Sequence, residues 1–337
     1  MIPTVDREGS LADALCALAV AARRWEEPVE VIVVDDSHPP ARHRAATWEV
    51  DGLAVRRVWT AERGRGPAAA RNLGLAEAAY DLVAFTDDDV RCDAGWLAAA
   101  AGRLRGDLAL AGVEGAVHVD LDRPVDPVRS RIVMNLRGGG YLTASLFLRA
   151  AAARAVGGFR QLRADGNAWA FPYREDTDLG LRVIAAVGPI TFAPEAVVYH
   201  PAEPVDLVRL VRLAHYYVVD AAFARLHPEA APVLWRRPLA RLRIRLACVT
   251  TLALPLLAVP RTRRTASLII LALSAAVSAQ VESELRSAGL RRPVPMAARD
   301  TFRRLPRSLV WSVAAGSARL QGEVMVRLGW AVPPDQS

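Results

Sequence analysis

The chain has 337 residues, a mass of 36.4 kDa and a formal net charge of +7. Because 52% of its residues are apolar and 23% are charged, the composition excludes a disordered or collagen-like chain and allows one large domain or two smaller ones. The three cysteines, Cys16, Cys92 and Cys248, lie far apart, which excludes a disulfide scaffold or a thiolate zinc site and favours a reducing compartment.

Charge is distributed unevenly along the chain. Residues 1–200 carry a balance of −4, whereas residues 201–337 carry +11, and every basic side chain is an arginine. A codon bias explains the absence of lysine, but it does not explain why the basic residues are concentrated in the second half of the chain. The asymmetry therefore predicts a nearly neutral catalytic half followed by a basic half that faces an anionic partner.

The first half alternates between predicted strands and helices. β-branched apolar runs at 29–34 and 81–86 predict two strands, and each ends in consecutive aspartates. Between them Pro67 suits a first helical turn, which predicts a helix over 68–80. Such units predict an α/β protein with a mainly parallel sheet flanked by helices, and the carboxyl edge of that sheet is where ligands bind.

Later segments suggest where a second region begins. We expect a helix from about 174 to 187, short strands at 190–192 and 196–200, and an amphipathic helix over 205–226. Apolar runs then follow arginine clusters, at 246–259, 266–281 and 309–315. The sequence thus predicts a catalytic domain over 1–205 and a basic, helical region over 206–337.

The acids that end the second strand carry the most chemical information. Carboxylates as closely spaced as Asp87, Asp88 and Asp89 repel one another unless a cation lies between them, and Mg²⁺ or Mn²⁺ suits such oxygen ligands. A bound ion of this kind stabilises a leaving diphosphate. The alternative is a solvated acidic turn that caps the next helix.

Two neighbouring features favour a nucleotide site. Asp35 and Asp36 end the other strand, where they are placed to accept hydrogen bonds from a base or ribose. Arg71 lies in the first turns of the intervening helix, where a guanidinium can hold a phosphate with two hydrogen bonds. Both features are expected at the same edge of the sheet as the acids at 87–89.

The order and spacing of several motifs resemble the family 2 glycosyltransferases of the GT-A fold over residues 1–205. The motifs are Ile2-Pro3-Thr4, Val33-Val34-Asp35-Asp36-Ser37, Gly66-Pro67 to Gly74, Phe85-Thr86-Asp87-Asp88-Asp89, Gly157-Gly158-Phe159 and Glu175-Asp176-Thr177-Asp178-Leu179. The resemblance implies transfer of a sugar from a nucleotide-diphosphate donor with inversion at the anomeric carbon.

The same resemblance implies roles for individual residues. The residues expected to bind the nucleotide sugar are Pro3, Thr4, Asp35, Asp36, Arg71, Asp87 and Asp88. Asp89, Asp87 and His200 are expected to hold Mn²⁺ or Mg²⁺, although a lone histidine at a strand end also suits a structural role. Asp176, beside Glu175, is expected to be the catalytic base, a group that the deprotonation of an acceptor hydroxyl requires. Plain helix capping is the alternative for these two acids.

Two departures from the family pattern stand out. The chain begins almost at Ile2, so we expect either a very short first strand or a misassigned start. Residues 1–7 contain no apolar run of the kind found in signal peptides, so we expect no secretory signal. After Phe159 comes Arg160 in place of the usual acid, followed by Trp169 and Phe171. These two rings suit either stacking on a sugar or a place in the core.

The basic half predicts association with a membrane surface. Its apolar runs of 14 and 16 residues are shorter than the roughly 20 of an ordinary span, and arginines flank the first run on both sides. Short hairpins or interfacial helices on the cytoplasmic face of the cell membrane satisfy both facts, with Trp235, Trp311 and Trp330 as anchors. The alternative is a helical pair buried in a dimer or against the catalytic domain.

The sequence as a whole predicts a metal-dependent inverting glycosyltransferase. Its expected partners are a nucleotide-sugar donor, a glycan or lipid-linked acceptor in cell-envelope synthesis and an anionic membrane surface, with self-association left open and nucleic acid excluded. Two alternatives remain. A nucleotidyltransferase would normally have a glycine-rich loop after the first strand, where Val5-Asp6-Arg7 stands. A non-catalytic, membrane-bound scaffold would lack the metal acids or Asp176.

Overall fold

A computed structural model describes most of the chain. The described residues are 1–37, 44–61, 66–160, 174–228, 238–290 and 293–327. They form two compact units. Unit 1 contains the described residues within 1–120, 133–161 and 174–201, and unit 2 contains those within 121–132 and 202–337. The predicted domain boundary at residue 205 stays a prediction.

Unit 1 begins with a sheet of four strands in the order β1-β2-β4-β3. The strands are β1 (Ile2–Thr4), β2 (Val31–Asp35), β3 (Thr47–Val50) and β4 (Leu53–Trp59). The three strands β1, β2 and β4 run parallel, and only the edge strand β3 is antiparallel to its neighbour. All five residues of β2 are buried, as expected for a central strand covered on both faces.

A second sheet of five strands, in the order β5-β9-β7-β10-β6, completes the unit. The strands are β5 (Leu82–Phe85), β6 (Arg91–Cys92), β7 (Gly112–Val119), β9 (Leu146–Arg149) and β10 (Ile190–His200). The strands β7 and β10 are parallel, whereas β9 and β6 oppose their neighbours. The Met1 amino group donates to Ala84 O, and Thr86 N donates to Met1 O, so β1 and β5 lie side by side and join the two sheets.

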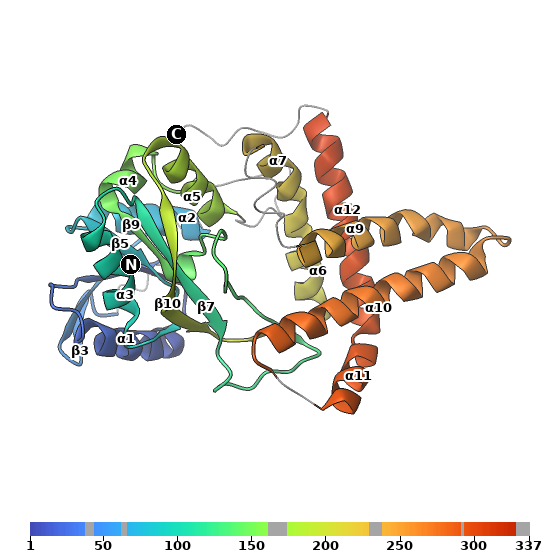
Figure 1. Cartoon of the computed structure of the whole chain (residues 1–337), viewed down its shortest axis with the longest axis horizontal. Helices are drawn as coiled ribbons and strands as arrows, with labels where there is room; N and C mark the ends of the chain where they lie inside the picture. The colour runs from blue at the N-terminus through green and yellow to red at the C-terminus, as the bar shows by residue number, and fades with distance from the viewer. Residues whose placement is uncertain (38–43, 62–65, 161–173, 229–237, 291–292, 328–337) are drawn as a thin grey trace. The chain divides into compact units, whose positions relative to one another are not determined.

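Helices cover both faces of these sheets (Figure 1). They are α1 (Glu8–Ala22), α2 (Gly66–Glu77), α3 (Trp96–Gly106), α4 (Ala150–Ala155) and α5 (Glu175–Ala186), with the 3₁₀ turn η1 (Thr143–Ser145) before β9. The helices α1 and α3 pack into one apolar cluster, and α2, α4 and α5 pack into another. This layering leaves the carboxyl ends of the parallel strands as the open edge.

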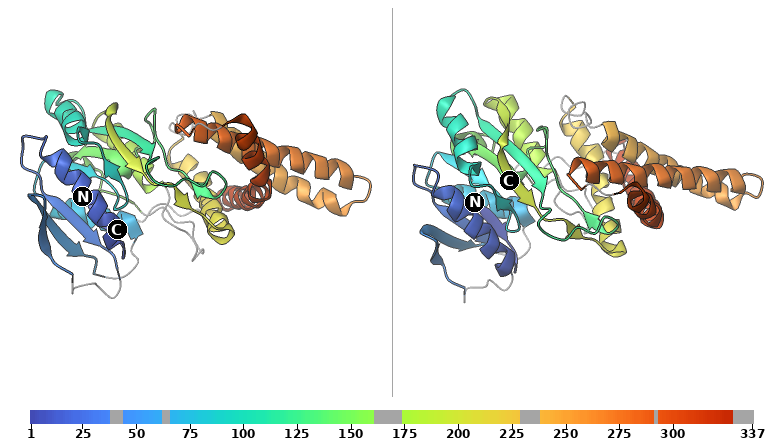
Figure 2. Two further views of the ribbon diagram at one scale, coloured as in Figure 1. Left: turned by 90° about the horizontal axis from the view of Figure 1, so that it is seen from below. Right: turned by 60° about the horizontal axis from the view of Figure 1, so that its bottom comes forward.

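Unit 2 is helical apart from a small pair of strands, β8 (Ser130–Arg131) and β11 (Glu203–Pro204). Its helices are α6 (Leu207–His215), η2 (Tyr216–Val218), α7 (Val219–Leu226), α9 (Pro238–Ala253), η3 (Leu254–Ala258), α10 (Arg263–Ser287), α11 (Val294–Arg303) and α12 (Leu305–Arg327). Figures 1 and 2 show α9 and α10 side by side as a hairpin that projects past α12. Within the described chain, α10 alone is long and apolar enough to cross a membrane by length and composition.

The predicted α/β class with a helical C-terminal region is confirmed, with mixed sheets because β3, β6 and β9 are antiparallel. The strands expected at 190–192 and 196–200 form one strand, β10, whose register with β7 shifts between Ala193 and Val197. The single helix expected over 205–226 is interrupted by the 3₁₀ turn η2.

Candidate active site

Strand ends bring the predicted acids to one edge of unit 1. The parallel arrangement of β1, β2 and β5 places Thr4, Asp35 and residues 86–89 at their carboxyl ends. Thr4 Oγ1 donates to Asp88 Oδ2 over 2.7 Å, which links the ends of β1 and β5 directly. The structure therefore groups residues that lie more than 80 positions apart in the sequence.

Arg7 holds two of the three consecutive aspartates. Its Nη1 lies 3.3 Å from Asp88 Oδ1 and 3.0 Å from Asp89 Oδ2. Burial raises the pKa of Asp88 to about 6, opposed by the hydrogen bond from Thr4 and by the charge of Arg7. Sequence analysis did not assign Arg7, because a basic residue just before a helix has no motif of its own.

Asp89 and His200 form the part of the site that suits a metal ion. His200 Nδ1 lies 2.8 Å from the carbonyl oxygen of Pro201, so a neutral ring places its proton there and leaves the lone pair of Nε2 free. That nitrogen lies 3.9 Å from Asp89 Oδ1. A carboxylate and an imidazole oriented by a carbonyl are a fitting donor set for a divalent cation.

Asp87, the other predicted metal ligand, is held elsewhere. Arg71 Nη2 donates to its Oδ1 over 3.0 Å. Within the described ranges no three His, Cys, Asp or Glu side chains are grouped closely enough to hold a metal. Of the three predicted metal ligands, Asp89 and His200 therefore lie 3.9 Å apart, while Asp87 is paired with Arg71.

Arg71 connects the acids after β5 to the start of α5. Its Nη1 lies 3.3 Å from Glu175 Oε1, while its Nη2 binds Asp87. Arg71 is buried, and its Nε has no hydrogen-bond partner among the described residues. Burial, and then the charge of Asp176, raise the pKa of Glu175 to about 7, although Arg71 opposes the shift.

Asp176 is placed differently from Glu175. Glu175 is buried against Arg71, whereas Asp176 is partly exposed and accepts a hydrogen bond from Thr177 N at its Oδ1 over 2.7 Å. Burial raises the pKa of Asp176 too, opposed by the Thr177 amide and the charge of Arg71. Of the two carboxylates, Glu175 therefore pairs with Arg71, and Asp176 is the more exposed.

The Gly157-Gly158-Phe159 motif positions Arg71 through contacts with its guanidinium and with the neighbouring Asn72. Phe159 N donates to Asn72 Oδ1 over 2.7 Å, and Asn72 Nδ2 donates back to Phe159 O over 2.8 Å. The Phe159 ring centroid lies 5.7 Å from the guanidinium carbon of Arg71. Gly158 has φ +69°, and a Cβ there would lie 2.5 Å from Asn72 Oδ1, so this close approach requires glycine.

The acids that end β2 are occupied by internal contacts. Asp35 is fully buried and accepts from Ser37, Oγ to Oδ1 over 2.5 Å, and from Arg44, Nη1 to Oδ2 over 3.0 Å. Asp36 Oδ1 accepts from Thr60 Oγ1 over 2.5 Å, and its Oδ2 accepts from Gly66 N over 3.2 Å. Both residues therefore hold the loops around the edge together.

Of the remaining residues singled out in the sequence, the structure describes one and does not describe the other two. Pro3 lies half-buried in β1, opposite Val34. Trp169 and Phe171 lie outside the described residues.

Glu114 is a polar residue in the core that sequence analysis did not find. It lies in β7, is 2% exposed and accepts hydrogen bonds from Asn135 Nδ2 and from the backbone N–H groups of Gly139, Gly140 and Tyr141. Gly140 O in turn accepts from Thr177 Oγ1 over 3.0 Å. The carboxylate thus fixes the glycine-rich loop against the start of α5, next to Asp176.

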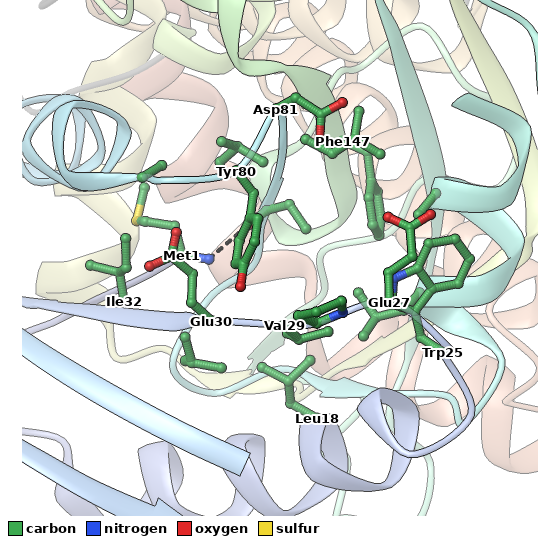
Figure 3. A pocket seen from close by; sticks show the side chains of 18 of the residues that line it. Met1, Leu18, Trp25, Glu27, Val29, Glu30, Ile32, Tyr80, Asp81 and Phe147 are labelled. Carbon is green, nitrogen blue, oxygen red and sulfur yellow. Dashed lines mark hydrogen bonds between the residues drawn. The ribbon is translucent and has the colours of Figure 1, made fainter. Parts of the chain in front are cut away.

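A cavity of about 140 Å³ lies at the opposite edge of the sheet (Figure 3). It is lined by Met1, Val29 and Asp81 near the amino ends of β1, β2 and β5, with Trp25 and Phe147 among its apolar walls. None of the predicted site residues is among its described lining residues. The cavity therefore includes none of the predicted acids, although Thr86, which precedes Asp87, also lines it.

The first part of the chain is similar to proteins of a known family. Residues 1–147 match the family described as "Glycosyl transferase family 2". The "Pre-mycofactocin glycosyltransferase" of Mycobacterium tuberculosis (strain CDC 1551 / Oshkosh) is 32% identical over 184 residues, which cover 50% of this chain and 37% of that protein. The protein of strain ATCC 25618 / H37Rv gives the same values. The match therefore spans well under half the length of these relatives.

Two solved structures resemble the chain over most of its length. The mannosyltransferase PcManGT from Pyrobaculum calidifontis, in complex with GDP-Man and Mn²⁺, has 17% identity and a TM-score of 0.48, covering 96% of this chain and 85% of that chain. S. aureus TarS 1–349, in complex with UDP-GlcNAc, has 16% identity and a TM-score of 0.45, covering 97% and 90%. Residues 1–147 are therefore similar to glycosyl transferase family 2.

Proposed function

We propose that the chain transfers a sugar from a nucleoside-diphosphate donor to an acceptor hydroxyl, with inversion at the anomeric carbon. One observation carries the proposal: Arg71 joins Asp87, at the end of β5, to Glu175 at the start of α5. This arrangement brings an anion-binding cation and a carboxylate base to one sheet edge. Donor binding and acceptor activation both require groups of this kind.

The donor side is supported by Arg71 and the acids around it. A guanidinium that now bridges two carboxylates has the geometry to hold two diphosphate oxygens instead. Thr4, Asp88 and Asp36 lie at the same edge, where the lone pairs of the two carboxylates that their internal contacts leave over would accept hydrogen bonds from the nucleoside. The buried Glu175 and the partly exposed Asp87 keep the guanidinium in place before the donor binds.

The base is Asp176. The acceptor oxygen attacks the anomeric carbon, the bond from that carbon to the diphosphate oxygen breaks, and the hydroxyl proton passes to Asp176. Attack from the face opposite the leaving group inverts the configuration. A raised pKa suits this role, because a carboxylate that is a stronger base takes a proton more readily near neutral pH.

Mn²⁺ or Mg²⁺ would be held by Asp89 and His200, the pair whose donor atoms face each other at 3.9 Å. When bound, the ion neutralises the charge that develops on the departing diphosphate. Arg7 holds one oxygen of Asp89 and thereby orients the other toward His200. We expect Asp89→Asn to abolish Mn²⁺ binding in isothermal titration calorimetry without donor, and the exposed Asp51→Asn to leave it unchanged.

The acceptor and location are proposed from unit 2. Its arginine-rich helices support action at the cytoplasmic face of the cell membrane, on a glycan or lipid-linked acceptor of cell-envelope synthesis, with self-association as a further expectation.

The experiment measures release of nucleoside diphosphate from a panel of nucleotide sugars by the purified full-length protein with Mn²⁺ or Mg²⁺. Arg71→Met should raise the KM for the donor by about tenfold or more, because a charge-assisted contact of roughly 1.5–3 kcal/mol is lost. Arg103→Met, which removes an exposed arginine paired with Glu195, is the matched control. Pyrophosphate release from a nucleoside triphosphate would indicate a nucleotidyltransferase instead, and donor binding without turnover would indicate a scaffold.

A further inference from the structure

Helix α11 buries a charged side chain and exposes large apolar ones. Its buried face contains Ala297 and Asp300, and Arg304, directly after it, is also buried. Its exposed face carries Val294, which is 71% exposed, and Phe302, which is 75% exposed. These two lie on one stripe at a spacing of eight residues. A helix at a water-facing surface places such residues inward.

Helix α10 also exposes large apolar side chains. Its buried face mixes apolar residues such as Ile270 and Val277 with the polar Ser278 and Glu282, while Leu268 is 68% exposed and Leu271 is 54% exposed. The inward polar groups pair with each other: Arg304 donates to Glu282 Oε2 over 2.6 Å and to Ser278 O over 3.0 Å. Polar groups paired in the interior and apolar side chains outside are typical of helices in contact with lipid.

The two exposed stripes lie on the same side of unit 2. An open groove of about 300 Å³ runs between α10 and α11. Its apolar lining includes Ala275 of α10 and Val294, Ala298 and Phe302 of α11, and the ion pair of Glu282 and Arg286 on α10 also lines it. Leu271 precedes Ala275 by four residues on the helix, so the exposed stripe of α10 leads into the groove. We call this continuous surface the outer face, defined by Leu268, Leu271, Ala275, Val294, Ala298 and Phe302.

The charges beside the outer face indicate which kind of surface the outer face binds. Residues 238–281 contain no aspartate or glutamate. Arg263 and Arg264 are exposed at the start of α10, and Arg299 and Arg303 are exposed on α11. An apolar surface bordered by arginines is complementary to a bilayer with anionic headgroups.

We propose that the outer face lies in the interfacial layer of an anionic bilayer. Leu268, Leu271 and Phe302 reach the first acyl carbons, the groove accommodates an acyl chain, and the arginines hold lipid phosphates. Insertion is shallow, because Glu282 and Glu284 lie in the second half of α10, where a spanning helix would be apolar. This inference rests on the proposed membrane location and is independent of the proposed glycosyl transfer.

The test compares binding of the full-length protein to phosphatidylcholine vesicles with and without phosphatidylglycerol, by co-sedimentation and without any donor. The double variant Leu268→Gln, Phe302→Gln should lower the partition coefficient by about tenfold or more, because two largely exposed apolar side chains no longer transfer to lipid. Leu108→Gln is the matched control, since Leu108 is 82% exposed but lies in unit 1. High salt should weaken binding to anionic vesicles.

Three results would overturn the inference. One is wild-type protein that stays in the supernatant with anionic vesicles at low salt. Another is a double variant that binds as the wild type does. The third is a double variant that changes from dimer to monomer in light scattering while its vesicle binding is unaffected, which would make the outer face a contact between two copies. Donor turnover measured in parallel separates these outcomes from failure of the proposed enzymatic function.

Discussion

Replacing Glu114 by glutamine tests how the glycine-rich loop supports the proposed base. The carboxylate accepts three hydrogen bonds at Oε1 and one, from Gly139 N, at Oε2. A glutamine amide would turn an N–H group toward Gly139 N, leaving one donor unmatched at a cost of roughly 1.5–3 kcal/mol. The three remaining bonds would weaken with loss of the charge.

An opposing effect limits the destabilisation. Burial raises the pKa of Glu114, so the neutral glutamine avoids the cost of desolvating a carboxylate. We therefore expect Glu114→Gln to lower the free energy of unfolding by about 2 kcal/mol. Because Gly140 O accepts from Thr177, a shift of the loop also moves the start of α5, and we expect kcat to fall by about tenfold or more with little change in donor KM.

The assays are urea unfolding and steady-state donor turnover. Glu195→Gln is the control, because Glu195 is exposed and pairs with Arg103 at the surface, and it should change the unfolding free energy by under about 0.5 kcal/mol. If Glu114→Gln matches the wild type in both stability and kcat, the loop does not position the base.

The remaining predictions concern pH and packing. Thr4→Val removes a hydrogen bond that favours the ionised form of Asp88, so its pKa should rise above about 6 and the acid limb of donor binding should move to higher pH; an unmoved limb contradicts this. Gly180→Ala places a Cβ 2.5 Å from Tyr141 Cγ, and thermal unfolding should show a loss of about 1–3 kcal/mol. Folding raises the pKa of Glu175 from 4.5 to about 7, so between these pH values the folded protein binds more protons than the unfolded chain. The free energy of unfolding should therefore fall as pH rises across this window. Glu175→Gln should reduce this pH dependence in urea titrations.

Local pattern was enough to predict the elements that carry the site. The runs at 29–34 and 81–86 correspond to β2 and β5, and the helix expected over 68–80 corresponds to α2. These elements are specified by short-range signals, namely β-branched runs that end in acids and a proline in the first helical turn.

Pairings across long separations could not be predicted in the same way. Glu114 is a single acid in an apolar strand, and its partners follow it by 21 to 27 residues through a loop whose conformation depends on that carboxylate. Arg71 and Glu175 are separated by 104 residues. The exposure of Leu268 and Phe302 in unit 2 was equally hidden, because apolar runs in a sequence do not show which side of a helix is covered.

Donor turnover by Asp176→Asn tests the central claim most directly. The substitution keeps the size of the side chain and the carbonyl oxygen that accepts from Thr177 N, but it removes the base. The account predicts that release of nucleoside diphosphate falls by about a hundredfold or more, while the donor dissociation constant measured by calorimetry stays within about twofold of the wild type. Turnover by Asp176→Asn at the wild-type rate would contradict the assignment of Asp176 as the base and the mechanism built on it.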